Sequence, residues 1–164
     1  MRTPCPLISL APQARALLPC LVGAVLLLAQ PASAQEAPEL ETEYWAHMLE
    51  GTRAAQTCLA DVMVEGSSEV QCNRMTPAFV QAVELAEQVE ACCPERMDFE
   101  IEGVRQFNLL NFARGHRALA DSIEAYRGRN EEGARARRVE LAGQVMAWRT
   151  VIELGAGGTA SNPR

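Results

Sequence analysis

The chain has 164 residues, enough for one domain, and it contains no lysine. All 21 acidic residues but only 13 of the 15 arginines lie in residues 35–164, so this part has a formal net charge of −8. An acidic balance excludes general nucleic-acid binding, which depends on basic side chains that neutralise phosphates. Abundant alanine, with arginine in place of lysine, indicates a bacterial protein from a G+C-rich genome.

Residues 1–34 are typical of a cleavable secretory signal. Two arginines accompany an apolar run over residues 17–29, and no acidic residue occurs before Glu36. The run is shorter than the roughly 20 apolar residues that span a bilayer. A proline and three small residues follow and end at Ala34. We therefore expect cleavage after Ala34, a periplasmic or secreted protein, and no transmembrane anchor in the mature chain.

The first predicted helix follows a short linker at residues 35–38. Apolar residues such as Tyr44, Met48 and Leu59 recur at steps of three, four or seven, the pattern of an amphipathic helix. Glutamates lie in its first turns, where the helix dipole favours negative charge. We expect this helix over 39–63.

The second predicted helix is bounded by prolines. Residues 65–74 contain Gly, Ser and Asn and predict a loop. Thr76 and Pro77 then predict a helix start, because Thr caps well and Pro fits the first helical position. Pro94 disfavours helical geometry in the residue before it, so this helix is expected over 77–92.

The last two predicted helices cover residues 98–127 and 131–154. Asp98 is the expected cap of the first, and a turn at 128–130 separates the two. Gly155 is expected to end the last helix, and residues 155–164 are small, polar and expected to be disordered.

These elements predict an all-α fold, a small antiparallel bundle of about four helices, because no period-two strand pattern is recognised. Residues 35–102 carry a net charge of −12 and residues 103–164 a net charge of +4. An acidic helical hairpin packed against a basic one explains this division. Head-to-tail or dimeric assembly through the same complementarity is the alternative.

Four cysteines, Cys58, Cys72, Cys92 and Cys93, are expected to form disulfides, since an exported protein meets an oxidising compartment. In a simple helical hairpin Cys58 and Cys92 would lie roughly 15 Å apart along the helix axes. A disulfide needs Cα atoms within about 7 Å, so Cys58–Cys72 is the easiest bond.

Three interpretations of Cys92 and Cys93 stay open. In the first, the second helix is broken or shifted and both cysteines pair with the other two. In the second, they form a vicinal disulfide or a reducible pair. In the third, they bind a soft metal ion such as Cu(I) or Zn(II), although no third ligand is obvious nearby. His116 is a separate candidate metal ligand, which could bind haem together with Met48.

Five arginines surround the predicted turn between the last two helices. The planar guanidinium group of arginine binds carboxylates and phosphates well, so this cluster is the candidate site for an anionic partner. A solvated helix end, partly neutralised by nearby glutamates, is the favoured interpretation of the same cluster. The five are Arg127, Arg129, Arg135, Arg137 and Arg138. No arrangement of nucleophile and base indicates an enzyme, and no motif indicates a cofactor.

The C-terminal stretch resembles one segment of the secreted lysozyme-inhibitor-like family. Gln144, Trp148 and Arg149, followed by residues 157–159, are similar to that family's Gln-Trp-Arg segment and glycine-rich end. The spacings differ, and the cysteine expected after the Trp-Arg pair is missing. The resemblance implies an inhibitor of a secreted hydrolase, and we do not assign the chain to the family on it.

The expected function is that of a non-enzymatic periplasmic or secreted interaction protein. Its partner is expected to be another protein or an envelope component rather than a nucleic acid or a small molecule. Two alternatives remain: a metal- or redox-active protein that uses Cys92 and Cys93, and a hydrolase inhibitor whose acidic surface meets a basic enzyme.

Overall fold

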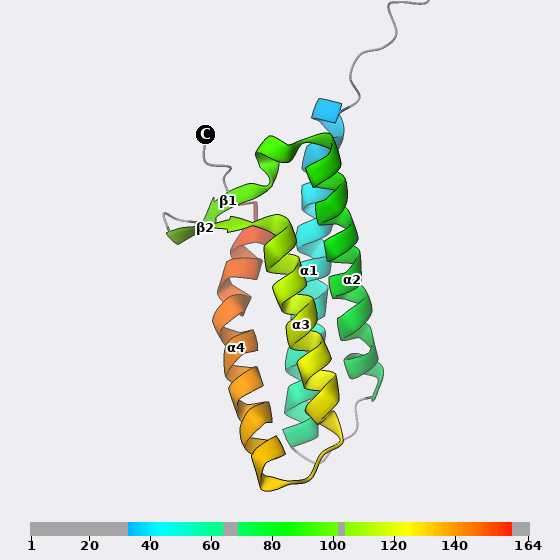
Figure 1. The fold of residues 1–164 in the computed structure, drawn as a ribbon, viewed down its shortest axis with the longest axis vertical. Helices are drawn as coiled ribbons and strands as arrows, with labels where there is room; N and C mark the ends of the chain where they lie inside the picture. Colours follow the sequence, from blue (N-terminus) through cyan, green and yellow to red (C-terminus); the bar gives the residue numbers. More distant parts are fainter. Residues whose placement is uncertain (1–32, 64–68, 102–103, 159–164) are drawn as a thin grey trace, which may run out of the picture. The chain divides into compact units, whose positions relative to one another are not determined.

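The computed structural model describes residues 33–63, 69–101 and 104–158 (Figure 1). The expected signal segment lies outside the described residues except for its last two positions. Residues 32–164 form one compact unit. Its elements are α1 (Ser33–Met63), α2 (Glu69–Cys92), the 3-10 turn η1 (Pro94–Arg96), β1 (Asp98–Ile101), β2 (Val104–Asn108), α3 (Leu109–Arg127) and α4 (Glu132–Ala156).

The four helices form an antiparallel bundle, which confirms the predicted architecture. Successive helices run in opposite directions, and α1 packs against both α2 and α4 while α3 packs against the same two helices (Figure 1). None of the described helices is both long and apolar enough to span a membrane.

All four helices contribute side chains to one hydrophobic core. Tyr44, Phe79, Ile123 and Leu141, one from each helix, are at most 2% exposed. The Tyr44 hydroxyl donates a hydrogen bond of 3.0 Å to the carbonyl of Leu109, which fixes the start of α3 against α1. Burial raises the pKa of Tyr44 well above its usual range, so the phenol stays protonated and keeps this bond.

α1 begins earlier than predicted, because it starts at Ser33 and includes the expected linker at 35–38. Pro38 lies inside the helix, and its carbonyl accepts a bond of 2.8 Å from the Thr42 hydroxyl. The helix gains tertiary support here, since the fork of Arg96 in η1 donates to both carboxylate oxygens of Glu41 at 2.5 and 2.9 Å. This anchoring explains why the segment is helical rather than a linker.

α2 also begins earlier than predicted, and the expected loop at 65–74 is wrong for residues 69–74. Pro77 therefore lies inside the helix rather than at its first position. The reason is burial: Cys72 and Met75 are both at most 1% exposed and extend the apolar stripe of α2 by one turn. The stripe continues directly into Phe79, so core packing outweighs the local preference for a break at proline.

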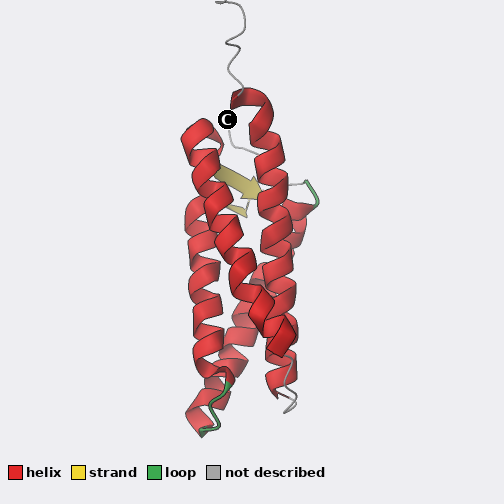
Figure 2. Cartoon of the chain, turned by 90° about the vertical axis from the view of Figure 1, so that its right-hand side faces the viewer, coloured by secondary structure: helices red, strands yellow, loops and turns green. Residues whose placement is uncertain are grey.

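Residues 98–101 and 104–108 form the two strands of a β-hairpin rather than the start of the third helix, so the expected helix over 98–127 is wrong at its beginning (Figure 2). β1 and β2 pair antiparallel, with Phe99 opposite Phe107. Within β1, Phe99 and Ile101 are buried, while Asp98 is exposed and Glu100 is half-buried, which is the period-two pattern of a strand. The cap of α3 is Asn108, whose side chain accepts from the backbone N–H of Asn111 at 3.2 Å.

The C-terminal helix confirms the prediction with small changes at its end. The turn at 128–130 is present, and α4 continues to Ala156. The helix therefore does not end at Gly155, and Gly157 is its C-cap residue. Gly155 instead allows close packing, because a Cβ atom there would lie 2.4–2.6 Å from ring carbons of Trp45. The predicted tail lies outside the described residues from 159 onward.

Candidate functional site

A cavity of about 620 Å³ opens between the hairpin, α3 and α4. Its apolar wall consists of Phe107 from β2, Phe112 from α3 and Trp148 from α4. The ring centroids of Phe107 and Trp148 are 5.8 Å apart, and those of Phe112 and Trp148 are 5.5 Å apart, both edge to face. We call this cavity the aromatic groove. Its volume is within the usual range for a binding site.

The hairpin and the start of α3 position this wall. The β1–β2 register stacks Phe107 on Phe99 with ring centroids 5.3 Å apart, so Phe107 is held in place by β1. Phe112 and His116 lie four residues apart on α3 and therefore share one face of the helix. Phe107 and Trp148 are only half-buried, which leaves part of each ring open to a ligand.

His116 is the polar group of the wall. Its side chain is 5% exposed and packs beside Phe112 and Trp148, at centroid distances of 4.5 and 6.0 Å. Nδ1 donates a hydrogen bond of 2.9 Å to the carbonyl of Phe112, and Nε2 is buried without a partner among the described residues. Burial lowers the pKa of His116, so the ring is neutral near pH 7 and Nε2 carries an unshared electron pair.

The rest of the lining is polar but nearly uncharged. Four amide side chains, Gln106, Asn108, Asn111 and Gln144, offer donors and acceptors. Asp98 is the one charged side chain among the described lining residues, and its carboxylate accepts a bond of 3.2 Å from the Asn108 amide. The groove therefore combines aromatic surface with hydrogen-bonding groups and admits no anion easily.

Gly115 leaves space in the lining. A Cβ atom at this position would have no neighbour within 4 Å. The same holds for Gly143 in α4, which is not among the lining residues. The two glycines thus form a matched pair for experiments, because a side chain added at either meets open space but only one of them faces the groove.

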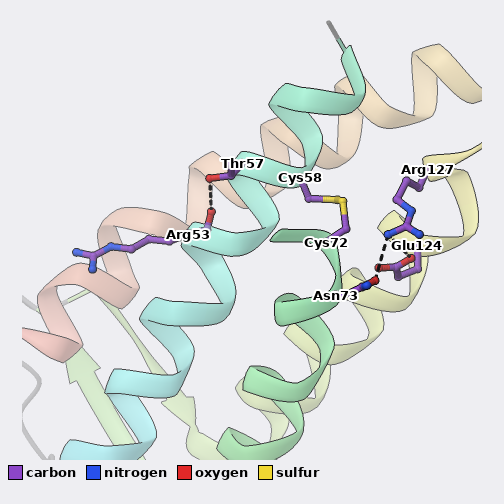
Figure 3. Close-up of a disulfide and its surroundings, with 7 residues drawn as sticks. All are labelled: Arg53, Thr57, Cys58, Cys72, Asn73, Glu124 and Arg127. Atoms are coloured by element: carbon purple, nitrogen blue, oxygen red, sulfur yellow. Dashed lines mark hydrogen bonds and ion pairs between the residues drawn. A yellow bond between two sulfur atoms is a disulfide. The ribbon is translucent and has the colours of Figure 1, made fainter. Parts of the chain in front are cut away.

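Of the four cysteines, Cys58 and Cys72 form a disulfide with Cα atoms 4.8 Å apart. Figure 3 shows it joining the last turns of α1 to the first turns of α2, next to Asn73, which accepts a bond of 3.4 Å from Arg127 of α3. The easiest predicted pairing is confirmed. The interpretation in which Cys92 and Cys93 pair with these two cysteines is wrong.

Cys92 and Cys93 are thiols at the end of α2. A hydrogen bond with Cys92 and, secondarily, burial raise the pKa of Cys93 to about 11. A raised pKa disfavours the thiolate, the form that attacks disulfides and binds metals. Within the described part of the chain, no three side chains of His, Cys, Asp or Glu are arranged to hold a metal ion. The third candidate ligand, His116, lies in the aromatic groove instead.

The five arginines of the predicted anion site surround the α3–α4 turn, at the other end of the bundle from the hairpin (Figure 1). Arg138 is 8% exposed and donates to the carbonyls of Tyr126 and Arg129, so it caps the end of α3. Arg127 contacts Glu124, Arg129 stacks over the Tyr126 ring, and Arg137 pairs with Glu140, while Arg135 is exposed. Four of the five arginines thus contact groups of the chain itself.

Sequence reasoning found His116 as a candidate but missed the groove around it. The signal that was available is the alternation of polar and apolar residues over 98–101, which favours a short strand but overlaps the helical pattern of the residues that follow. Gln144 and Trp148, singled out by the resemblance to lysozyme inhibitors, both line the groove.

No protein family, no curated protein and no solved structure shows significant similarity to this chain. The function is therefore argued from the aromatic groove and the sequence alone.

Proposed function

We propose that the chain is an exported, non-enzymatic protein that binds another protein or an envelope component in the aromatic groove. The observation that carries the proposal is the half-buried ring surface of Phe107 and Trp148 in a cavity that four amide side chains also line. Exposed aromatic surface with hydrogen-bonding groups around it is typical of a binding site.

The nearly uncharged lining supports binding rather than catalysis. Amides hold and orient a ligand, but they do not transfer protons as a pair of titrating groups would. The one carboxylate, Asp98, is already bonded to Asn108. Purification of the chain with a stoichiometric cofactor would contradict this part of the proposal.

The test of binding uses the glycine pair as matched variants. The wild-type chain, Gly115→Leu and Gly143→Leu are each immobilised and exposed to an envelope extract of the host. We expect the wild type and G143L to retain the same partner and G115L to lose it, because only that leucine fills the groove. Equal retention by all three would place the partner on another surface.

A secreted hydrolase is the first partner to test, because Gln144 and Trp148 of the segment that resembles lysozyme inhibitors lie in the groove. Lysozyme activity is measured with each of the three chains at micromolar concentration. Inhibition by the wild type and G143L, but not by G115L, is the expected result for an inhibitor. Absence of inhibition removes this class of partner and leaves the binding proposal to the extract experiment.

Export is tested by the intact mass of the chain purified from its host. We expect the mass of residues 35–164, which follows from cleavage after Ala34, together with one disulfide. A mass that includes the first 34 residues would contradict export with cleavage.

The thiol pair supports a second candidate, a metal- or redox-active protein. Cys92 and Cys93 lie in hydrogen-bonding contact, and Cys92 lines a shallow cavity together with Glu39 and Glu43. Alkylation before the mass measurement, with metal analysis of the same sample, separates the two candidates. Two alkylated thiols and no metal favour the binding protein, whereas a bound metal ion or an oxidised pair favours the second candidate.

A further inference from the structure

The aromatic groove offers ring surface to a ligand. Phe107 and Trp148 are half-buried, so part of each ring is accessible. The rings of Phe107 and Phe112 meet the indole of Trp148 at steep angles, 83° and 87°. The third ring in contact with this indole, that of His116, meets it at 72°, so no described ring is stacked in parallel on Trp148. A flat ligand can therefore add an apolar contact that the chain itself does not make.

The polar side chains of the groove can both donate and accept hydrogen bonds. Each Asn or Gln amide has two N–H donors and one carbonyl acceptor, and a carboxylate adds further acceptors. Asp98 is held in place, because it accepts a bond from Asn108, whose carbonyl oxygen accepts in turn from the Asn111 backbone. The side-chain amides of Gln106 and Asn111 make no hydrogen bond with any described residue, so they are available to a ligand.

The charge of the groove favours a neutral ligand. Asp98 is the one charged side chain among the described lining residues, and it repels carboxylates and phosphates. Asp98 is also exposed, and an exposed ion pair contributes only about 0–1 kcal/mol, so the carboxylate gives little preference to a cation. Its oxygens are better used as acceptors for the hydroxyl groups of an uncharged ligand.

A neutral saccharide has both surfaces that this lining requires. One face of a pyranose ring consists of weakly positive C–H groups, which are attracted to the negative face of an aromatic ring. The hydroxyls around the same ring each donate and accept, so they can bond to amides and to a carboxylate at once. An aliphatic chain has no such groups, and a peptide has only its backbone amides in regular supply.

Resting on the proposed function, we propose that the aromatic groove binds a neutral saccharide of the envelope, with a pyranose ring against Phe107 and Trp148 and its hydroxyls bonded to Asp98 and the amides. The amides are those of Gln106, Asn108, Asn111 and Gln144. The cavity of about 620 Å³ is within the usual range of small-ligand sites and admits a short saccharide. The partner is then a glycan rather than a protein.

The test compares two probes that differ in their apolar face. N,N′-diacetylchitobiose is a neutral disaccharide, and sorbitol is a linear polyol that has hydroxyls but no ring. Binding of each to the purified chain is measured by isothermal titration calorimetry. We expect the disaccharide to bind with a dissociation constant of about 1 mM or lower and sorbitol to bind at least about tenfold more weakly. Equal affinity for the two, or no binding of the disaccharide at about 10 mM, would overturn the proposal.

Variants assign the hydroxyl contacts to the amides. Asn111→Ala and Gln106→Ala remove exposed side chains that make no hydrogen bond with the described residues, so both should keep the fold. Each should bind the disaccharide about fivefold to tenfold more weakly, the effect of roughly one hydrogen bond. Gln88→Ala is the matched control, because Gln88 is an exposed amide of α2 outside the groove. G115L should not bind, and G143L should behave as the wild type. Undiminished affinity in both amide variants would contradict the proposal.

A measurement on the wild-type chain does not depend on the folding of any variant. The chain has two tryptophans, and Trp45 is only 6% exposed, so acrylamide quenches mainly the fluorescence of Trp148. The disaccharide should protect Trp148 from acrylamide, and sorbitol should not. If calorimetry shows binding without such protection, the saccharide lies elsewhere and the proposal is wrong.

Failure of this inference is distinguishable from failure of the proposed function. The extract experiment with G115L and G143L tests the groove without assuming a saccharide. If the wild type and G143L retain a protein that G115L loses, and the disaccharide does not bind, the groove remains a binding site but its ligand is not a glycan.

Discussion

The imidazole of His116 is packed against Phe79 as well as the two rings of the groove wall, and this burial lowers its pKa. The unfolded chain therefore binds a proton at this position more readily than the folded chain. The stabilisation from keeping the ring neutral is complete above the unfolded pKa of about 6.5. It is lost progressively as the pH falls from there through the lower folded pKa. We expect the free energy of unfolding, measured with urea, to decrease over this range.

His116→Gln should reduce this decrease, because glutamine does not titrate. His47→Gln is the matched control, since His47 lies on the surface of α1 with 34% of its side chain exposed. The comparison is the difference in unfolding free energy between about pH 7 and pH 5 for the three chains. If H116Q shows the same pH dependence as the wild type, the stability loss arises elsewhere.

Gly155 supports the packing of α4 on α1. In Gly155→Ala the new Cβ would lie within 2.6 Å of three Trp45 ring carbons, so the indole or the helix must shift. We expect a loss of about 1–3 kcal/mol in the free energy of unfolding. Gly143→Ala, with no neighbour within 4 Å, should instead gain about 0.5–1 kcal/mol from helix propensity. Equal changes in the two variants, measured by chemical denaturation, would rule out the close contact as the cause.

At the scale of the element, the disulfide sets the register of the first helical hairpin. Cys58 and Cys72 are 14 positions apart and join α1 to α2 across the connection between them (Figure 3). Closing a loop of this length lowers the conformational entropy of the unfolded chain, which stabilises the folded state by about 3 kcal/mol. We expect Cys58→Ser/Cys72→Ser to lose about that much stability, measured by thermal and urea unfolding.

Cys92→Ser/Cys93→Ser is the control for this prediction, because neither side chain takes part in the Cys58–Cys72 bond. Adding a reductant to the wild type should reproduce the loss, and adding it to the Cys58→Ser/Cys72→Ser variant should change nothing. A reductant effect that survives in that variant would assign the stabilisation to the other cysteines.

Helices with long apolar stripes could be predicted from the sequence, while their ends could not. Periodicity found all four helices because each buries one face in the common core. Pro38 was expected in a linker and Pro77 at the first position of a helix, yet both lie inside helices. Contacts such as Glu41–Arg96 and the burial of Cys72 decide these ends, and they join residues far apart in the sequence. The sequence pattern of a single helix carries no information about such long-range contacts.

The hairpin was missed for a related reason. The stripe of α3 can be continued backwards through Val104 and Ile101 at helical spacing, so the helical pattern overlaps the period-two pattern of two short strands. Strands of four and five residues carry too few positions for the periods to be told apart. Burial of Phe99 against Trp45, with centroids 4.9 Å apart, favours the hairpin, and this contact exists only in the folded chain.

Considered as a whole molecule, the aromatic groove is a product of tertiary structure. Its lining draws on β1, β2, α3 and α4, whose contributing residues span positions 98–148. Sequence patterns indicate which residues of one element face the core, and they placed His116 on the apolar face of α3. They do not show that Phe107 and Trp148 meet beside it, because that depends on the hairpin and on the antiparallel order of the helices.

The same aromatic cluster joins the hairpin to the bundle, which leads to a prediction about cooperativity. Phe99 of β1 contacts Trp45 of α1, Phe107 of β2 and Phe112 of α3, at centroid distances of 4.9, 5.3 and 5.7 Å. In Phe99→Ala the loss of these contacts should cost about 3–5 kcal/mol. Because Phe99 couples the hairpin to α1 and α3, we expect far-UV circular dichroism and tryptophan fluorescence to shift together in one transition.

Val139→Ala is the control for this prediction, since Val139 is 57% exposed on α4 and its truncation should change stability by no more than about 0.5 kcal/mol. In Phe99→Ala, the two signals to compare are far-UV circular dichroism and tryptophan fluorescence. If the helical signal kept its wild-type midpoint while fluorescence changed early, the hairpin would be an appendage that unfolds separately. A common, lowered midpoint means that the hairpin and helices fold as one unit, so the groove between them is as rigid as the core it adjoins.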